Sequence, residues 1–185
     1  HRTGDIMYDA SLFYRSLPYE PTVKTPDDFF LITLHRAENT DDPERLRSIV
    51  EALNSFSEMR GILPLHPRTK KMLSQQGLQF EKHIEVIEPI GFLDMIKLED
   101  RCRFIVTDSG GVQKEAYFFK KPCITLRDQT EWVETVEAGA NVIVGADGSR
   151  IESALKQPPS PSKWTELYGD GNSGEEILRA LTAHS

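Results

Sequence analysis

Short apolar runs alternate with amphipathic stretches along most of the chain, beginning at Asp28. The apolar runs are rich in β-branched and aromatic residues, and the stretches between them place apolar residues at helical spacing. This alternation is typical of a parallel sheet whose strands are joined by crossover helices. The pattern predicts six strands, over residues 29–34, 62–65, 84–87, 104–107, 123–126 and 142–144.

The segments between the predicted strands carry signals for helix starts. The clearest lies at Asp42-Pro43, where an acidic N-cap precedes a proline at the first helical position and the apolar residues between 46 and 53 mark one face. Further helices are expected over residues 6–17 and 175–183 and after His66-Pro67, Gly91, Gly110-Gly111, Thr130-Glu131 and Gly148.

The length and order of these elements predict one α/β domain with a doubly wound, Rossmann-like parallel sheet. The chain has 185 residues, of which 38% are hydrophobic, and this is enough for one core of ordinary size. Prolines at 18, 21 and 26 indicate that residues 1–27 end in an irregular linker, and 157–161 is a proline-rich break. We therefore expect a linker over 1–27, the Rossmann-like domain over 28–160 and a helical segment over 161–185.

The charge of the chain narrows the range of partners. Its 22 Lys and Arg residues against 29 Asp and Glu residues give a net charge of -7. No broad basic surface for nucleic acid is expected, although a small phosphate site remains compatible with this balance.

Cysteine usage and hydropathy indicate the compartment. Cys102 and Cys123 each lie beside an apolar run, without C-x-x-C spacing, and are expected to be buried thiols rather than disulfide partners or metal ligands. No apolar run approaches the length of a membrane span, and the N-terminus shows no signal pattern, so a cytoplasmic location is expected. Since the chain begins at His1 without Met, it is either a processed product or a segment of a longer protein.

The end of the fourth predicted strand is the strongest candidate for a binding site, because ligands of open parallel sheets bind beyond the carboxyl ends of the strands. There Ser109, Gly110 and Gly111 lead into a helix. Glycines allow close approach of the backbone, and the first N–H groups of a helix attract anions, so this turn predicts a diphosphate cradle. An ordinary tight turn between strand and helix remains the alternative.

Glu115 is expected about one turn into that helix, facing the loop. A carboxylate there can accept hydrogen bonds from both hydroxyls of a ribose. The alternatives are an acidic residue on a solvated helix surface and a capping-box partner of the loop.

The other strand ends also carry polar side chains. His35 and Arg36 follow the first strand, where Arg36 can bind phosphate and His35 can donate a hydrogen bond or act as an acid; the alternative is an ion pair between Arg36 and Glu38. His66 follows the second strand, where a His-Pro turn is also an ordinary helix start. Arg127 follows the fifth strand and can reach a phosphate or pair with a nearby acid.

Taken together, these motifs resemble the non-hydrolysing UDP-N-acetylglucosamine 2-epimerases, and their order and spacing match over nearly the whole chain. The motifs are His35-Arg36-x-Glu38-Asn39, Thr107-Asp108-Ser109-Gly110-Gly111-x-Gln113-x-Glu115, Lys121-Pro122, Arg127-Asp128-x-Thr130-Glu131 and Tyr168-Gly169-Asp170-Gly171. The resemblance implies the C-terminal, UDP-binding domain of a two-domain GT-B architecture. Residues 1–27 would then include the connection between the domains.

The resemblance also implies roles for individual residues. Catalytic contact with the diphosphate and the reacting sugar falls to His35, and a second, regulatory nucleotide-sugar site would use Arg36 and His66. The UDP-binding set is Ser109, Gly110 and Gly111 for the diphosphate, with Arg127 nearby, Glu115 for the ribose, and the backbone near Phe92 and Met95 for the uracil. Three departures from the family pattern are Ala37 and Trp132, where many members have Arg, and the stretch 66–69.

The family reaction interconverts UDP-N-acetylglucosamine and UDP-N-acetylmannosamine, an isomerase activity of cell-envelope polysaccharide biosynthesis, by elimination and re-addition of UDP without a cofactor. The carboxylates that move the C2 proton lie in the N-terminal domain of the family, so this chain alone is expected to be inactive. A full-length homodimer is expected as well. The alternatives are an epimerase of a UDP-2,3-diacetamido sugar, a GT-B glycosyltransferase and a non-catalytic nucleotide-sugar sensor.

Overall fold

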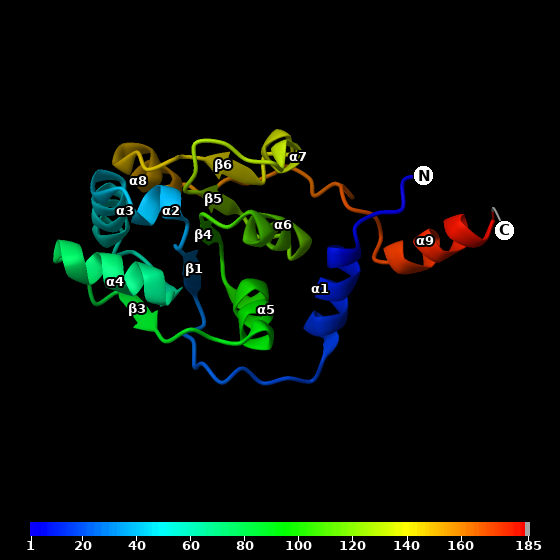
Figure 1. Ribbon diagram of the computed structural model, residues 1–185, viewed down its shortest axis with the longest axis horizontal. Helices are drawn as coiled ribbons and strands as arrows, with labels where there is room; N and C mark the ends of the chain where they lie inside the picture. The colour runs from blue at the N-terminus through cyan, green and yellow to red at the C-terminus, as the bar shows by residue number, and fades with distance from the viewer. Residues whose placement is uncertain (184–185) are drawn as a thin grey trace.

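The predicted apolar runs form the six strands of one parallel sheet in the computed structural model, which describes residues 1–183 (Figure 1). The strand order is β3-β2-β1-β4-β5-β6, and every neighbouring pair is parallel. The predicted fold class, a doubly wound parallel sheet, is confirmed. The strands are β1 (Phe29–Thr33), β2 (Arg60–Pro64), β3 (Ile84–Ile87), β4 (Ile105–Thr107), β5 (Cys123–Thr125) and β6 (Asn141–Ile143).

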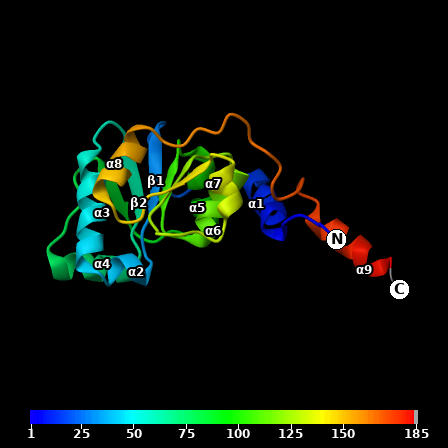
Figure 2. The same cartoon turned by 90° about the horizontal axis from the view of Figure 1, so that it is seen from above.

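Helices connect the strands and cover both faces of the sheet (Figures 1 and 2). Those that lie between or directly after strands are α2 (Ala37–Thr40), α3 (Pro43–Ser55), α4 (Pro67–Gln76), α5 (Phe92–Arg101), α6 (Gly110–Phe118), α7 (Val133–Glu137) and α8 (Gly148–Lys156). The predicted starts are confirmed where a cap signal was present. Asp42 caps α3, with its carboxylate accepting from the N–H groups of Glu44 and Arg45, and Pro43 occupies the first helical position.

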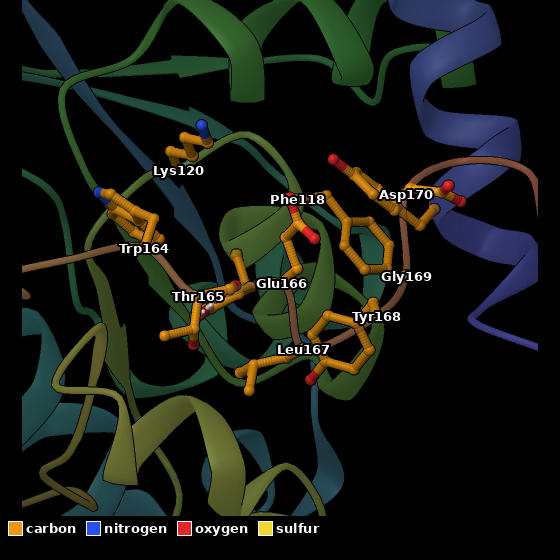
Figure 3. Close-up of a pocket in the computed structure, with 11 residues that line it drawn as sticks. Phe118, Lys120, Trp164, Thr165, Glu166, Leu167, Tyr168, Gly169 and Asp170 are labelled. Carbon is orange, nitrogen blue, oxygen red and sulfur yellow. Dashed lines mark hydrogen bonds between the residues drawn. The ribbon is translucent and has the colours of Figure 1, made fainter. Parts of the chain in front are cut away.

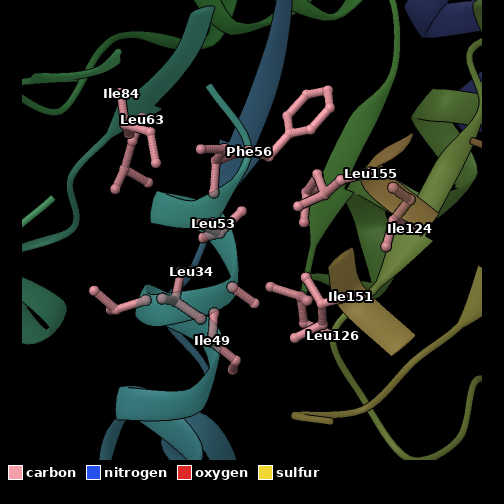
Figure 4. Close-up of a cluster of buried hydrophobic side chains, with 14 of the residues drawn as sticks. Leu34, Ile49, Leu53, Phe56, Leu63, Ile84, Ile124, Leu126, Ile151 and Leu155 are labelled. Carbon is pink, nitrogen blue, oxygen red and sulfur yellow. The ribbon is translucent and has the colours of Figure 1, made fainter. Parts of the chain in front are cut away.

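Alternate residues of each strand enter two separate hydrophobic cores. Phe30 and Ile32 point to the face covered by α3 and α8, and Figure 4 shows Ile49 and Leu53 of α3 within that cluster. Phe29 and Leu31 point to the opposite face and pack with residues of α5 and α6. Because both faces of the sheet are covered, β1, β4 and β5 are buried along their whole length, whereas the edge strands β3 and β6 are partly exposed.

The two end helices, α1 (Ile6–Ser16) and α9 (Ser173–Thr182), lie outside this sandwich (Figure 2). α1 packs against α5 and α6, with the ring of Tyr8 5.1 Å from that of Phe118. α9 contacts α1, where the N–H of Gly174 donates to Asp9 at 2.8 Å. The outer face of α9 exposes Leu178 and further apolar side chains.

The order of the strands fixes where ligands can bind. The chain moves outward from β1 to β2 and β3 on one side, then returns to place β4, β5 and β6 on the other. The connections therefore leave β1 and β4 in opposite directions, and a crevice opens beyond their carboxyl ends, where doubly wound sheets bind ligands.

The structure differs from the sequence prediction mainly at the ends of elements. The strand ends shift by one or two residues, α9 begins at Ser173 rather than at 175, and α2 was not predicted. α2 has only four residues and no side-chain cap, so it carries neither a helical period nor a cap signal.

Removing the ring of Phe30 tests the larger core. Phe30 is 0% exposed and its ring stacks on that of Phe104, with 5.1 Å between the ring centroids. We expect Phe30→Ala to lower the free energy of unfolding by about 3–5 kcal/mol, through lost burial and a cavity. Phe13→Ala, at a position 60% exposed, is the control and should cost less than about 1 kcal/mol. Equal urea midpoints for the two variants would contradict the assigned core.

Candidate functional site

The turn between β4 and α6 places the start of a helix at the carboxyl edge of the sheet. Ser109 is the N-cap of α6, and its Oγ accepts a long hydrogen bond of 3.5 Å from the N–H of Val112. The N–H of Ser109 is bound to Oγ1 of Thr107 at 2.9 Å. The next amides, those of Gly110 and Gly111, belong to the first turn of α6 and have no carbonyl partner one turn back.

Neither glycine is required by backbone strain, because the positive-φ glycines of the chain do not include Gly110 or Gly111. Packing does not require them either. A Cβ on Gly111 would meet nothing closer than Oγ of Ser109 at 3.9 Å, and one on Gly110 would lie 3.5 Å from Oε2 of Glu131. Gly110 is buried, whereas Gly111 is only partly buried and has nearly open space at its Cβ position. The missing side chain at Gly111 therefore leaves room for an anion beside the start of α6.

Asp108 holds the loop after β1 against the end of β4. Its carboxylate is 0% exposed and accepts hydrogen bonds from the N–H groups of His35 and Arg36, at 3.1 and 2.9 Å, and from Nδ2 of Asn39 at 3.3 Å. The Nδ1 atom of His35 lies 3.6 Å from Oδ1 of Asp108. One buried carboxylate thus fixes both the backbone and the imidazole of the first motif.

Asn39 extends this arrangement to the loop after β5. Its Nδ2 also donates to the carbonyl oxygen of Leu126 at 2.8 Å, and its Oδ1 accepts from Nε of Arg45 at 3.2 Å. Arg45 in turn binds Asp128 at 3.1 Å and lies 3.6 Å from Glu38. The ends of β1, β4 and β5 are therefore linked by side-chain hydrogen bonds.

The loop after β5 forms one wall of the cradle. Arg127 binds both carboxylate oxygens of Glu131, at 2.8 and 3.0 Å, so the ion pair considered from the sequence is present. This bond holds the pKa of Glu131 below its usual value and raises that of Arg127. The indole N–H of Trp132 donates to the carbonyl oxygen of Gly110 at 2.7 Å and braces the first turn of α6.

The loops after β1 and β2 bring two imidazoles together. The centroids of the His35 and His66 rings are 5.7 Å apart. Arg36 lies near the start of α6, where its Nη2 atom is 3.8 Å from the position that a Cβ would take on Gly110. His66 is also the N-cap of α4, with its Nδ1 accepting from the N–H of Arg68 at 3.2 Å. The alternative pair of Arg36 with Glu38 is not among the ion pairs of residues 1–183, where Glu38 pairs with Arg45.

Glu115 lies on α6 against the buried Glu99 of α5, and burial raises its pKa. It is therefore not a solvated surface acid. It is not a capping-box partner either, because the N–H of the N-cap Ser109 donates to Oγ1 of Thr107 instead. Phe92 and Met95 occupy the first turn of α5, whose N-cap is Gly91 and which has no side-chain cap, so its first amides are open as well.

A cavity of about 210 Å³ lies at the opposite end of α6 from the cradle (Figure 3). It is walled by aromatic rings, including those of Tyr117, Trp164 and Tyr168, with Lys120 and Asp170 beside them. None of the predicted site residues lines it. The candidate site is instead the open edge of the sheet, which a second structural unit would have to cover to form a closed pocket.

Within residues 1–183, no three His, Cys, Asp or Glu side chains group in a way that could hold a metal ion. Cys102 and Cys123 are buried free thiols, as expected. No helix in this part of the chain is both long and apolar enough to cross a bilayer.

The fold is that of a Rossmann-like domain, with a candidate anion site at the switch point of its sheet. The chain belongs to the UDP-N-acetylglucosamine 2-epimerase family, whose model matches residues 1–182. This confirms the resemblance seen in the motifs.

Two similar relatives are named for different UDP-sugar substrates. The chain is 48% identical over 183 residues to a UDP-2,3-diacetamido-2,3-dideoxy-D-glucuronate 2-epimerase of Pseudomonas aeruginosa, a match that covers 96% of this chain and 51% of the relative. It is 46% identical over 169 residues to a UDP-N-acetylglucosamine 2-epimerase of Methanocaldococcus jannaschii, covering 87% of this chain and 46% of that protein. The chain thus spans about half the length of the relatives it matches.

The solved structures agree with this family. The M. jannaschii UDP-GlcNAc 2-epimerase in complex with UDP-GlcNAc and UDP superposes with a TM-score of 0.82 at 40% identity, covering 98% of this chain and 54% of that one. Another structure of the M. jannaschii enzyme gives a TM-score of 0.86 at 41% identity, covering 98% and 55%.

Sequence reasoning did not find the residues that hold the site together. Asp108 and Asn39 were members of the quoted motifs without a role, and Trp132 was noted only as a departure from the family pattern. The polar types of Asp108 and Asn39 directly after strands were the available signal. Their partners could be identified only once β1, β4 and β5 were known to be neighbours.

Asp108→Asn tests the central carboxylate. The side-chain amide of asparagine would place a donor against the backbone N–H groups of His35 and Arg36, which now donate to the carboxylate. We therefore expect a loss of about 3 kcal/mol in the free energy of unfolding. Large NMR shifts are expected at the backbone amides of the same two residues. Asp128→Asn, at an exposed partner of Arg45, is the control and should cost less than about 1 kcal/mol. Equal losses in urea unfolding would show that Asp108 has no special structural role.

Proposed function

We propose that this chain is the UDP-binding, C-terminal half of a nucleotide-sugar 2-epimerase that interconverts UDP-N-acetylglucosamine and UDP-N-acetylmannosamine. The observation that carries the proposal is the start of α6 at the switch point, where neither strain nor packing requires Gly110 and Gly111 and the space around Gly111 is nearly open. Membership of the epimerase family supports it, and so does the likeness to a structure that contains UDP-GlcNAc and UDP.

In this proposal each part of the nucleotide has its own partner. The diphosphate binds the hydroxyl of Ser109 and the amides of Gly110 and Gly111, where the partial positive charge at the start of α6 stabilises it. Glu115 accepts hydrogen bonds from the ribose hydroxyls, and the backbone at the start of α5, near Phe92 and Met95, meets the uracil.

The same groups favour departure of UDP. The proposed reaction removes the proton at C2 and breaks the bond from C1 to the diphosphate, then adds a proton to the other face of C2 and returns UDP to C1. Charge grows on the leaving diphosphate, and donors fixed in advance at the start of α6 stabilise it without reorganising. His35, held by Asp108, faces this position as a donor, with Arg36 and Arg127 beside it.

A second half is needed to complete the enzyme. We propose that the missing N-terminal domain supplies the carboxylates that handle the C2 proton, and that this chain alone binds UDP but does not turn over. We assign residues 1–27 and 161–185 to the connection with that domain, because α1 and α9 pack together outside the sandwich and α9 exposes Leu178. A homodimer of the complete enzyme and a cytoplasmic location belong to the same proposal.

The proposed UDP contacts do not determine which sugar the enzyme acts on. The relative that acts on a diacetamido glucuronate is 48% identical and the UDP-N-acetylglucosamine enzyme 46% identical, so similarity alone does not separate the two substrates. Both require the same UDP contacts. An epimerase of a UDP-2,3-diacetamido sugar is therefore the second candidate function.

Arg36 and His66 are proposed as a regulatory pair. The His66 ring lies 5.7 Å from the His35 ring, so a second nucleotide sugar bound there would touch the first site directly. Arg36 reaches toward Gly110 and is positioned to contact both molecules.

Gly111→Ala separates ligand binding from stability. A methyl group in the first turn of α6 covers the amides that the diphosphate needs, while alanine suits a helix at least as well as glycine. We expect UDP affinity to fall at least tenfold, with unfolding free energy unchanged or higher by up to about 1 kcal/mol. The measurement is an NMR titration with UDP, which in the native chain should give saturable shifts from Ser109 to Glu115.

Gly174→Ala, in the first turn of α9 and far from the sheet edge, is the matched control and should bind UDP as the native chain does. Undiminished affinity in Gly111→Ala would exclude the cradle as the diphosphate site.

The reaction itself is tested in the complete protein that contains this chain and its N-terminal half. Incubated with UDP-N-acetylglucosamine in deuterated water, it should place deuterium at C2 of both epimers, because the C2 proton is exchanged in each direction. The UDP-2,3-diacetamido sugar is assayed in parallel, and faster exchange with it would assign the second candidate function. Transfer to an acceptor without C2 exchange would indicate a glycosyltransferase, and binding without either reaction would indicate a sensor.

A further inference from the structure

A carboxyl group with no assigned role is buried beside the proposed ribose site. Glu99 on α5 is 0% exposed, and neither of its carboxyl oxygens has a hydrogen-bond donor among residues 1–183. No ion pair of this part of the chain includes it. An ionised carboxylate without donor or cation is very costly in a protein interior, so Glu99 must be uncharged in the folded chain.

The helix segments around Glu99 and Glu115 pack in one hydrophobic cluster, with Leu98 of α5 and Ala116 of α6 among its members, and this brings the two carboxyl groups together. Burial, and then the negative charge of Glu115, raises the pKa of Glu99 well above its ordinary value. Two carboxylates can only accept, so a hydrogen bond between these groups exists only when one of them holds a proton. Glu99 is the more deeply buried of the two and keeps the proton, while its hydrogen bond to Glu115 lowers the pKa of Glu115 against the effect of burial.

The other charged groups around α5 do not neutralise Glu99. Toward α1, Lys97 donates to the carbonyl oxygens of Arg15 and Leu17, and Asp100 pairs with Arg15 at 3.0 Å. On the inner side, the thiol of Cys102 donates to the backbone oxygen of Glu99 at 3.3 Å, and burial raises the pKa of that thiol. These contacts leave the Glu115 carboxylate as the acceptor for the Glu99 proton.

We propose that Glu99 is a positioning residue, a neutral carboxylic acid that donates to Glu115 and holds it as an oriented carboxylate for the two ribose hydroxyls. The inference rests on the proposed function, in which Glu115 binds the ribose. The pair then carries one proton and one negative charge between them at neutral pH, which is the combination that a hydroxyl-binding carboxylate needs in a buried setting.

The position of the proton is measured directly by carbon NMR of the glutamate carboxyl groups, assigned by Glu99→Gln and Glu115→Gln. We expect the Glu99 signal at the position of a protonated acid at neutral pH and the Glu115 signal at that of a carboxylate. Glu88, 83% exposed and paired with Lys70, supplies the reference signal of a surface carboxylate. A carboxylate signal from Glu99 at neutral pH would overturn the proposal.

UDP affinity separates positioning from filling of the core. Glu99→Gln keeps a neutral donor and should bind UDP within about twofold of the native chain, whereas Glu99→Leu fills the space without a donor and should bind roughly tenfold more weakly. Native affinity in Glu99→Leu would show that the donor is not used. NMR spectra of both variants establish that they remain folded.

Stability against pH provides a further readout. A carboxyl group whose pKa is raised on folding stabilises the fold fully below its unfolded pKa and loses that contribution as pH rises through the folded pKa. Glutamine never ionises, so the stability of Glu99→Gln relative to the native chain should increase with pH across that range. A difference that does not change with pH would contradict a buried, protonated Glu99.

Glu115→Ala distinguishes failure of this inference from failure of the ribose assignment. If Glu115→Ala binds UDP as the native chain does, the ribose assignment is wrong. If it binds weakly while the Glu99 signal of the native chain is that of a carboxylate, the ribose assignment stands and the positioning role of Glu99 is rejected.

Discussion

The candidate site depends on one buried carboxylate. Asp108 follows β4, yet most of its hydrogen bonds go to the loop after β1, because those two strands are neighbours at the switch point of the sheet. Burying a charge costs a large free energy unless donors surround it, and here backbone amides and Asn39 supply them. The result is that His35 and the start of α6 are held in one fixed relation before any ligand arrives.

The proposed anion-binding role of Gly110 and Gly111 depends on this fixed arrangement. Backbone amides bind an anion well when they are exposed and cannot turn away. Gly111 leaves space at the start of α6, while the indole of Trp132 holds the carbonyl of the buried Gly110 and Arg127 fixes Glu131 beside it. Trp132 thus braces the first turn of α6 through a neutral donor.

Much of the fold could be predicted from the sequence, because its signals are local. Apolar runs marked the strands, and caps such as Asp42-Pro43 marked the helices. Ser109 and the glycines after it were also found locally, as a turn between strand and helix. The supporting contacts could not be found this way. Asp108 binds residues about seventy positions earlier in the chain, and the pair of Glu99 with Glu115 depends on how α5 packs against α6.

The same contacts explain why this half of the enzyme would hold the nucleotide without performing the proton transfer. A base for the C2 proton must be ionised, accessible and free to accept. Among the described residues at the sheet edge, Asp108 is buried under its donors, Glu131 is bound on both oxygens by Arg127, and Glu38 lies against Arg45. Glu115 is committed to the ribose in the proposed complex. In the proposed function, the charges of this chain therefore stabilise a leaving diphosphate, and the groups that move the proton belong to the N-terminal half.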